Sequence, residues 1–341
     1  MTEDMVDSPR PKKHRWILWT ALSLVGVLVV GAGVGVTYLW SLASSFNDQV
    51  TTLPSTEVFP EESLRPATPE PAQPSAPVAQ NILLLGSDTR GQLGDAALED
   101  LRGQRSDTMM VVHIPADREN IQVMSIMRDN WVPIAGHGNA KINAALALGG
   151  VPLTVQTVEG IIGSRIDHVA IVDFEGFKGL TDALGGVTVE NAQPFKTFPA
   201  GQINLNGEDA LTFVRERMSF PDGDYSRARN QQAYMKGLLQ GILSADTLLN
   251  PGKIAGLVNA VAPYLTVDSG ITATYAADLG VQLREIRSDD ITFFTSPTLG
   301  TGTSADGQSI VIPDWAELEV IKAAFASDSL DQYSPKPQFG S

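Results

Sequence analysis

The chain of 341 residues contains no cysteine and only four histidines. Without cysteine it has no disulfide, no thiolate zinc site and no cysteine nucleophile. The usual inference of cellular compartment from cysteine content is therefore not possible. The histidines lack metal-ligand spacing, and the folded region contains neither a Gly-x-Ser-x-Gly elbow nor a Walker loop. These absences argue against zinc hydrolysis, serine hydrolysis and P-loop chemistry.

Basic residues are also scarce. The chain has 24 Lys and Arg against 39 Asp and Glu, a formal net charge of -15. A surface of this sign repels nucleic acid, so any anion site must be local. Apolar residues are plentiful, at 43% of the chain. This composition suits one sizeable α/β core with appendages.

Residues 16–40 form a stretch without charge that is long enough to cross a bilayer as one helix. Basic residues crowd its N-terminal side, whereas residues 41–50 contain no Lys or Arg. The positive-inside rule therefore places residues 1–15 in the cytoplasm and everything after residue 40 outside the cell. A cleaved signal peptide is the alternative, but its apolar region would be unusually long.

Two further segments read as appendages to the folded domain. Residues 41–80 are polar and rich in proline, which predicts an extended extracytoplasmic linker. Residues 327–341 read as a flexible C-terminal tail. The folded domain is therefore expected to span residues 81–326.

Three apolar runs predict neighbouring strands near the start of this domain. Residues 81–86 read as a strand buried on both faces, and residues 108–114 as a second strand. A short polar loop leads to residues 121–127, which a hairpin makes antiparallel to the second strand. If the first strand is also antiparallel to the second, the ends of all three meet at one edge of the sheet.

Charged residues stand where these strands end. Asp88 follows the first strand, Arg105 and Asp107 precede the second, and Arg128 follows the third. Charged side chains beside buried segments are costly unless paired, so the arginines predict a polyanionic ligand. The aspartates predict a divalent cation, although Gly-Ser-Asp-Thr is also good turn chemistry. Together they suggest reactions of a diphosphate.

Residues 211–218 resemble another short strand, in which Arg215 and Arg217 share one face. Two adjacent guanidinium groups repel each other unless an anion lies between them. The alternative is a pair of surface residues bound to acids such as Glu208 or Glu216.

Helical patterns separate the predicted strands. The fold class is therefore α/β, as an α/β/α layered sandwich on a mixed central sheet, preceded by one transmembrane helix. The helical patterns cover residues 140–148, 153–162, 174–184, 231–243, 272–284 and 315–326.

Six short motifs in sequence make the chain resemble the LytR-CpsA-Psr family of cell-wall glycopolymer ligases. The resemblance covers essentially all of residues 81–243, and the anchor with its outward topology also matches. The motifs are Asn81–Asp88, Arg105–Met110, Ser125–Asp129, Lys141–Ala145, Asp182–Val187 and Phe213–Arg217.

The resemblance implies an enzyme that moves an anionic glycopolymer from a polyprenyl diphosphate carrier to peptidoglycan and forms a phosphodiester bond. It implies Mg²⁺, with Mn²⁺ as the alternative, at Asp88 and Asp107. Lys141 and Asn143 either cap a helix or add to the diphosphate site. The other residues implied to bind the diphosphate or take part in catalysis are Arg105, Arg128, Arg215, Arg217, Asp224, Arg227 and Gln231.

One departure from the family pattern concerns the residue before Gln231. The arginine often found there is Asn230, and Arg229 lies one place earlier, so Arg227 is the better candidate ligand. Asp88, Asp107 and Asp224 are candidates for the general base, but metal-bound carboxylates are poor bases.

Two other functions stay open. The same residues would serve a pyrophosphatase that lets water attack a lipid-linked diphosphate, or an anchored protein that only binds wall glycan or lipid. Family members have been called transcriptional regulators, but an acidic domain beyond the membrane has no route to DNA. The glycopolymer is equally open among teichoic acid, arabinogalactan and capsular polysaccharide.

Overall fold

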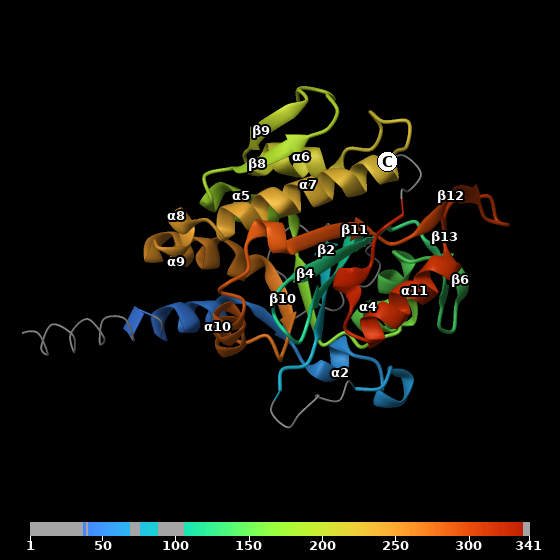
Figure 1. Ribbon diagram of the computed structural model, residues 1–341, viewed down its shortest axis with the longest axis horizontal. Helices are drawn as coiled ribbons and strands as arrows, with labels where there is room; N and C mark the ends of the chain where they lie inside the picture. Colours follow the sequence, from blue (N-terminus) through green and yellow to red (C-terminus); the bar gives the residue numbers. More distant parts are fainter. Residues whose placement is uncertain (1–36, 39, 69–75, 88–105, 337–341) are drawn as a thin grey trace, which may run out of the picture. The chain divides into compact units, whose positions relative to one another are not determined.

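The computed structural model describes residues 37–38, 40–68, 76–87 and 106–336 (Figure 1). The chain divides into two units, Met1–Ser44 and Ser45–Ser341, and the second contains the fold described below. Nearly all of the predicted transmembrane helix, together with Asp88 and Arg105, lies outside the described residues. Within them, one helix is long and apolar enough to span a membrane, α4 (Ala144–Ile162), but it is mostly buried in the protein interior.

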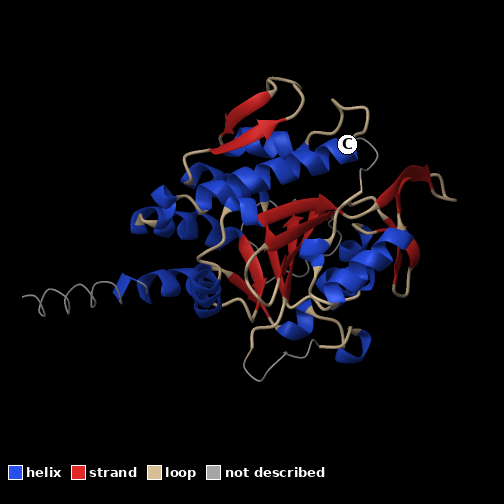
Figure 2. Cartoon of the chain, viewed as in Figure 1, coloured by secondary structure: helices blue, strands red, loops and turns tan. Residues whose placement is uncertain are grey.

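A mixed sheet of seven strands forms the centre of the second unit (Figure 2). Its strands run in the order β1, β10, β7, β2, β3, β4 and β11. The bounds are β1 Thr51–Leu53, β10 Leu265–Asp268, β7 His168–Val172, β2 Gln80–Ser87, β3 Ser106–Ile114, β4 Ile121–Ile126 and β11 Ile291–Thr295.

Helices cover both faces of this sheet, as the layered sandwich predicts (Figure 1). One layer holds α4, α11 (Trp315–Ala326) and the short α2 (Ser55–Val58). The other holds α5, α6 and α7, with α8 and α9 beside them. Their bounds are α5 Phe174–Ala183, α6 Gly207–Arg215, α7 Asp224–Ile242, α8 Ala245–Leu248 and α9 Pro251–Val261.

The other elements used below, within the described residues, are a further helix and three hairpins. The helix is α10 (Ala273–Gln282), and the hairpins join β5 to β6, β8 to β9 and β12 to β13. Their bounds are β5 Trp131–Ile134, β6 Gly138–Lys141, β8 Val187–Asn191, β9 Gly201–Leu205, β12 Thr298–Thr303 and β13 Ser309–Pro313.

The predicted pairing of the first three strands is confirmed. β2 and β4 both lie antiparallel to β3, and Ser87 at the end of β2 pairs with Ser106 at the start of β3. β4 ends at this same edge, where Arg128 follows. The expectation of full burial on both faces of β2 is wrong, because Leu83 lies beneath the α4 layer whereas Leu84 borders a cavity.

The helical predictions are confirmed in type for most segments but differ in their bounds. The patterns at 140–148 and 153–162 belong mostly to α4, which bends at Gly149 and Gly150, while residues 138–141 form β6. Helix α7 begins at Asp224, seven residues before the pattern predicts. The strand predicted over residues 211–218 is wrong, because most of this segment belongs to α6.

The predicted linker over residues 41–80 is in part an integral piece of the domain. β1 pairs in parallel with β10 at the sheet edge, and Val58 of α2 is fully buried against the main core. Arg65 then forms a buried ion pair with Glu159 of α4, at 2.7 Å. Proline ends short elements here instead of forming a stalk, and the domain includes this segment.

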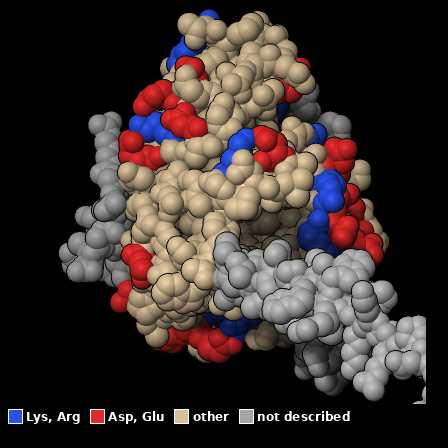
Figure 3. Space-filling view, turned by 90° about the vertical axis from the view of Figure 1, so that its left-hand side faces the viewer, with Lys and Arg blue, Asp and Glu red and all other residues tan. Residues whose placement is uncertain are grey.

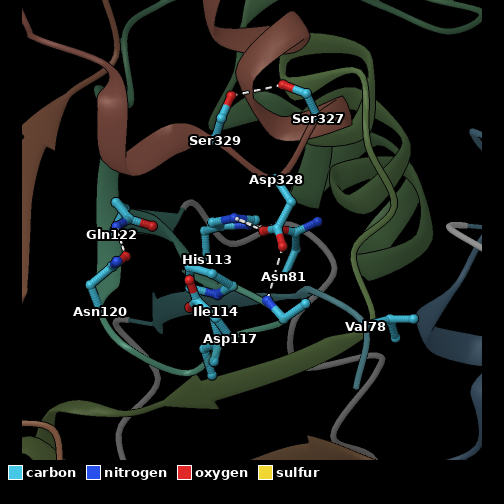
Figure 4. A network of polar contacts seen from close by, with 12 residues as sticks. Val78, Asn81, His113, Ile114, Asp117, Asn120, Gln122, Ser327, Asp328 and Ser329 are labelled. Carbon is cyan, nitrogen blue, oxygen red and sulfur yellow. Dashed lines mark hydrogen bonds and ion pairs between the residues drawn. The ribbon is translucent and has the colours of Figure 1, made fainter. Parts of the chain in front are cut away.

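The predicted C-terminal tail also packs onto the domain. Leu330 is buried in the main core, and the ring of Tyr333 contacts that of Phe294. Asp328 accepts a hydrogen bond of 3.0 Å from Nε2 of buried His113, whose Nδ1 lies 2.8 Å from Oδ1 of Asn81 (Figure 4). These contacts attach residues 328–333 to β2, β3 and β11.

Candidate active site

A cavity of about 370 Å³ lies between the central sheet and helices α5, α6 and α7. Four of the predicted arginines line it, together with Gln231. Arg128 follows β4, so it lies at the sheet edge where β2 ends and β3 begins. The apolar part of the lining includes Leu84, Met110, Phe177, Leu180, Leu211, Val214, Met235 and Leu238. The cavity therefore joins a cationic region to an apolar one.

Two of these arginines are held by carboxylates. Nε of Arg128 lies 3.7 Å from Oδ2 of Asp129, and Arg227 is 2.8 Å from Oδ1 of Asp224. Arg227 and Asp224 lie three residues apart on one face of α7, and of the two Arg227 lines the cavity. Fixed guanidinium groups bind an anion with a smaller loss of side-chain entropy.

Arg215 and Arg217 are exposed and make no ion pair with an acid in the described part of the chain. Glu208 pairs with Lys178 and buried Glu216 pairs with Lys196, so the alternative in which these acids bind the arginines is wrong. The guanidinium of Arg215 stacks over the ring of Phe174 at 4.6 Å. Helix α6 ends at Arg215, and the extended backbone at Glu216 leads Arg217 to the same cavity.

Asp129 and Asp224 form a carboxyl pair beside the arginines. Burial and a hydrogen bond to Asp129 raise the pKa of Asp224 above its ordinary value. Burial alone would raise the pKa of Asp129 as well, but its hydrogen bonds with Asp224 and Lys141 lower it overall. The pair therefore holds a proton on Asp224 to a higher pH than an isolated aspartate does.

Of the remaining predicted residues, Lys141 and Asn143 contact the residues that form the site, and Gln231 is part of its lining. Lys141 lies 3.1 Å from Oδ1 of Asp129, and neither Lys141 nor Asn143 lines the cavity. The backbone N–H of Asn143 donates to the carbonyl of Arg128. Gln231 lines the cavity and donates to the hydroxyl of Thr108 at 3.0 Å.

The side chain of Arg229 does not contribute to the cavity. It donates to Asp222 at 2.6 Å and to Ser226 at 2.7 Å, and it is not part of the cavity lining. The preference for Arg227 over Arg229 as an anion ligand therefore agrees with their positions.

Asp129 and Asp173 are site residues that sequence reasoning did not assign. Asp129 directly follows Arg128, and that adjacency was the available signal. Asp173 follows β7, which lies parallel to β2, so a polar residue at the carboxyl end of a buried strand was also a usable signal. Oδ1 of Asp173 accepts from the backbone N–H of Gly176, and burial raises the pKa of this carboxyl.

The predicted metal site lies mostly outside the described residues. Asp88 and Arg105 are beyond them, and of Asp107 only the backbone in β3 is described. Among described side chains, no group of three His, Asp or Glu residues is arranged to bind a metal. Ser87 and Ser106, the sequence neighbours of Asp88 and Asp107, pair at the edge of the sheet.

The cationic region is local. On the face drawn in Figure 3, the described acidic and basic side chains are interspersed in small groups on a mostly uncharged surface. Such a face offers no broad positive field for a nucleic acid. The four arginines thus concentrate positive charge in a chain whose net charge is -15.

Comparison with known proteins identifies related sequences. Residues 52–327 match the model of the LytR_cpsA_psr family. The chain is 32% identical over 306 residues to the cell wall biosynthesis protein LcpA of Corynebacterium glutamicum, covering 77% of this chain and 58% of LcpA. It is 34% identical over 258 residues to the polyisoprenyl-teichoic acid–peptidoglycan teichoic acid transferase TagU of Bacillus cereus, covering 74% of this chain and 80% of TagU.

The fold has solved relatives as well. The crystal structure of Bacillus subtilis TagV superposes with a TM-score of 0.62 at 26% identity, covering 76% of this chain and 99% of TagV. The family match begins at residue 52, which agrees with the packing of β1 and α2 into the domain.

Proposed function

The chain belongs to the LytR-CpsA-Psr family, and from this premise we propose that it transfers an anionic cell-wall glycopolymer from a polyprenyl diphosphate carrier to peptidoglycan. The product is a phosphodiester bond between polymer and peptidoglycan. The names of the relatives support a polymer donor and a peptidoglycan acceptor. Because the chain spans only 58% of LcpA, the substrates are part of this proposal.

The observation that carries the proposal is the composition of the cavity. Four arginines meet the phosphates, and the adjoining Leu, Met and Phe side chains offer an apolar lining for a polyprenyl tail. Guanidinium groups bind phosphate oxygens with two parallel hydrogen bonds, and burial of the tail adds affinity in proportion to its area. An amphiphilic diphosphate satisfies both regions at once.

The proposed reaction is a phosphoryl transfer. A sugar hydroxyl of the acceptor attacks the phosphorus that bears the polymer, the bond to the bridging oxygen breaks, and polyprenyl phosphate leaves. Arg128, Arg215, Arg217 and Arg227 offset the charge that develops on the phosphate oxygens. The Asp129–Asp224 pair, in its deprotonated form, accepts the hydroxyl proton.

The proposal includes a cation and a membrane. Asp88 and Asp107 would hold Mg²⁺, or Mn²⁺ as the alternative, which supplies further charge neutralisation at the diphosphate when bound. Residues 16–40 would anchor the chain in the cell membrane, with the domain on the cell-wall side. This placement brings the cavity to the side where peptidoglycan lies.

The test uses the full chain in detergent with a polyprenyl diphosphate-linked oligosaccharide and peptidoglycan fragments, followed by mass spectrometry of lipid and sugar. We expect sugar phosphate on the peptidoglycan, and its loss in Asp107→Ala and after chelation of divalent cations. Cleavage of the donor without sugar transfer would instead establish the pyrophosphatase. An intact donor that still binds would establish a binding protein.

A further inference from the structure

A second hollow, apart from the arginine cavity, is lined by residues of hairpins β5–β6 and β12–β13 and by the start of α11. Figure 1 shows where β6, β12, β13 and α11 lie in the fold. The hollow has a volume of about 450 Å³. We call it the tryptophan groove, and its lining consists of Trp131, Pro133, Asn139, Ile310, Ile312, Pro313 and Trp315. An adjoining hollow of about 580 Å³ shares Pro133 and Trp315 and continues between α4, α11 and residues 63–66.

The apolar side chains of the groove are accessible. Trp315 is 39% exposed and Ile312 is 38% exposed, and Trp131 is partly exposed. Large apolar side chains that gather on a concave surface mark a binding site more often than scattered ones do. Each hollow also falls in the range of about 300–1,000 Å³ that is usual for ligand sites.

Polar groups without partners accompany these aromatic faces. The indole N–H groups of Trp131 and Trp315 make no hydrogen bond within the described residues, and neither do the side-chain amides of Asn139 and Gln156. Sugar rings present a face of C–H groups that packs on an indole and a rim of hydroxyls that bonds to amides. Tryptophan, with an apolar body and one donor, serves both needs.

The charged side chains around the groove favour an uncharged glycan over an anionic one. The two cationic side chains at the adjoining hollow are already paired, Arg65 with Glu159 and Lys322 with Glu319, each at 2.7 Å. An anionic polymer with a phosphate in every repeat would meet no available cation there. An uncharged chain of amino sugars, with N-acetyl groups and hydroxyls, is the better match.

One short segment of the chain contributes to both the groove and the arginine cavity. Arg128 lines the cavity and Trp131, three residues later, lines the groove. Between them, the carbonyl of Asp129 accepts from the backbone N–H of Val311 at 2.9 Å, which attaches the segment to β13. Three residues span at most about 11 Å, so a glycan strand bound at Trp131 would lie within that reach of the backbone at Arg128.

We propose that the tryptophan groove binds the glycan strand of the peptidoglycan acceptor, an uncharged β-linked amino-sugar chain. This inference rests on the proposed transferase function, because the acceptor is defined by that reaction. Trp131 and Trp315 provide the stacking faces, and Asn139 and Gln156 bind the rim of the sugars. The groove therefore sets acceptor affinity, whereas the arginines act on the donor.

The binding test uses the full chain in detergent and chitohexaose, an uncharged β-linked N-acetylglucosamine oligomer, as the probe. Trp131 and Trp315 are two of only five tryptophans in the chain, so indole emission reports on the groove, with calorimetry as a second readout. We expect chitohexaose to bind the native chain and to bind Trp315→Ala about tenfold or more weakly. Trp315→Phe, which keeps an aromatic face, should recover part of the affinity.

Val320→Ala is the matched control, because Val320 is 52% exposed on the same helix but outside both hollows. It should bind like the native chain. Equal binding by native and Trp315→Ala proteins of equal thermal stability would overturn the inference. So would a groove that binds polyglycerol phosphate in preference to chitohexaose.

The transfer assay separates the two proposals. In Trp315→Ala we expect a higher half-saturating concentration of peptidoglycan fragments at nearly the same maximal rate. Arg215→Ala should lose transfer but bind chitohexaose as the native chain does. A native chain that binds chitohexaose through Trp315 and never transfers polymer would support the glycan site and overturn the transferase.

Discussion

The four arginines of the cavity differ in how they are held, and this difference has consequences for their contributions. Arg227 pairs with Asp224 and Arg128 lies beside Asp129, which Lys141 also contacts, so removing either arginine also changes the surroundings of the Asp129–Asp224 pair. Arg215 contacts only the ring of Phe174 in the described structure. Its removal therefore reports most directly on substrate.

We expect Arg215→Ala to lower the rate of polymer transfer by about 10²–10³-fold, the usual loss for one donor to a developing charge. Arg215→Lys should recover only part of this, because an ammonium cannot bind two phosphate oxygens in parallel. Arg229→Ala is the control, since Arg229 pairs with Asp222 outside the cavity. Steady-state transfer rates, measured on variants whose melting temperatures match that of the native chain, check this prediction. Equal losses of rate in Arg215→Ala and Arg229→Ala would contradict it.

The Asp129–Asp224 pair predicts a pH dependence. Because burial and Asp129 raise the pKa of Asp224, the base form appears only as the pH rises through that raised value. Transfer should rise over the same range, and Asp224→Asn should lower it by about 10²–10⁴-fold and abolish the rise. The measurement is kcat/KM against pH, with Asp222→Asn as a matched change at an aspartate that pairs with Arg229 and not with Asp129.

The same shift has a stability consequence of defined sign. An aspartate with a raised folded-state pKa binds its proton more tightly when folded, so its ionised form destabilises the fold above that pKa. Asp224→Asn should therefore be at least as stable as the native chain at pH 8, with the difference shrinking as the pH falls. A variant that is less stable at pH 8 but active would remove the pair from the mechanism.

Among the secondary-structure elements, strand pairing was predictable and the last arginine segment was not. The short polar loop between β3 and β4 predicts their hairpin, whereas the antiparallel pairing of β2 with β3 entered only as a condition, which the structure fulfils. The secondary structure of residues 211–218 was ambiguous because a short apolar run is compatible with either a strand or a helix. Two features show that this segment is helical. The side chain of Asn206 caps the helix by accepting from the N–H of Asp209, and the buried residues Ala210, Phe213 and Val214 repeat at helical spacing.

The N-terminal segment was misread for a different reason. Its prolines fit a linker composition, and β1 is only three residues long, too short for a periodic pattern. What fixes the segment is a long-range contact, Arg65 with Glu159, and such pairs leave no local signal in a sequence. The same holds for the contact between Asp328 and His113.

We expect Arg65→Ala to destabilise the domain by about 3–5 kcal/mol, because Glu159 is then a buried charge without a cation. Adding Glu159→Gln should recover part of the loss, since the amide still accepts from the N–H of Ile166. Urea unfolding of the single and double variants gives both values. If the single variant matches the native chain, residues 51–66 do not contribute to the fold.

For the molecule as a whole, the absence of cysteine makes the proposed orientation directly testable. Ser8→Cys precedes the predicted membrane helix, and Ala305→Cys lies in the exposed turn between β12 and β13. With the domain on the cell-wall side, a membrane-impermeant maleimide should label only Ala305→Cys in intact protoplasts and both variants after lysis. The native chain, which carries no thiol, is the control for background labelling.

The opposite pattern would place the arginine cavity in the cytoplasm. A donor could reach it there, but peptidoglycan could not, and the transferase proposal would fail even with the cavity intact. Labelling of both sites only after lysis would have the same meaning. Orientation thus decides which acceptor the site can meet, whereas the arginines and the apolar lining decide only what it binds.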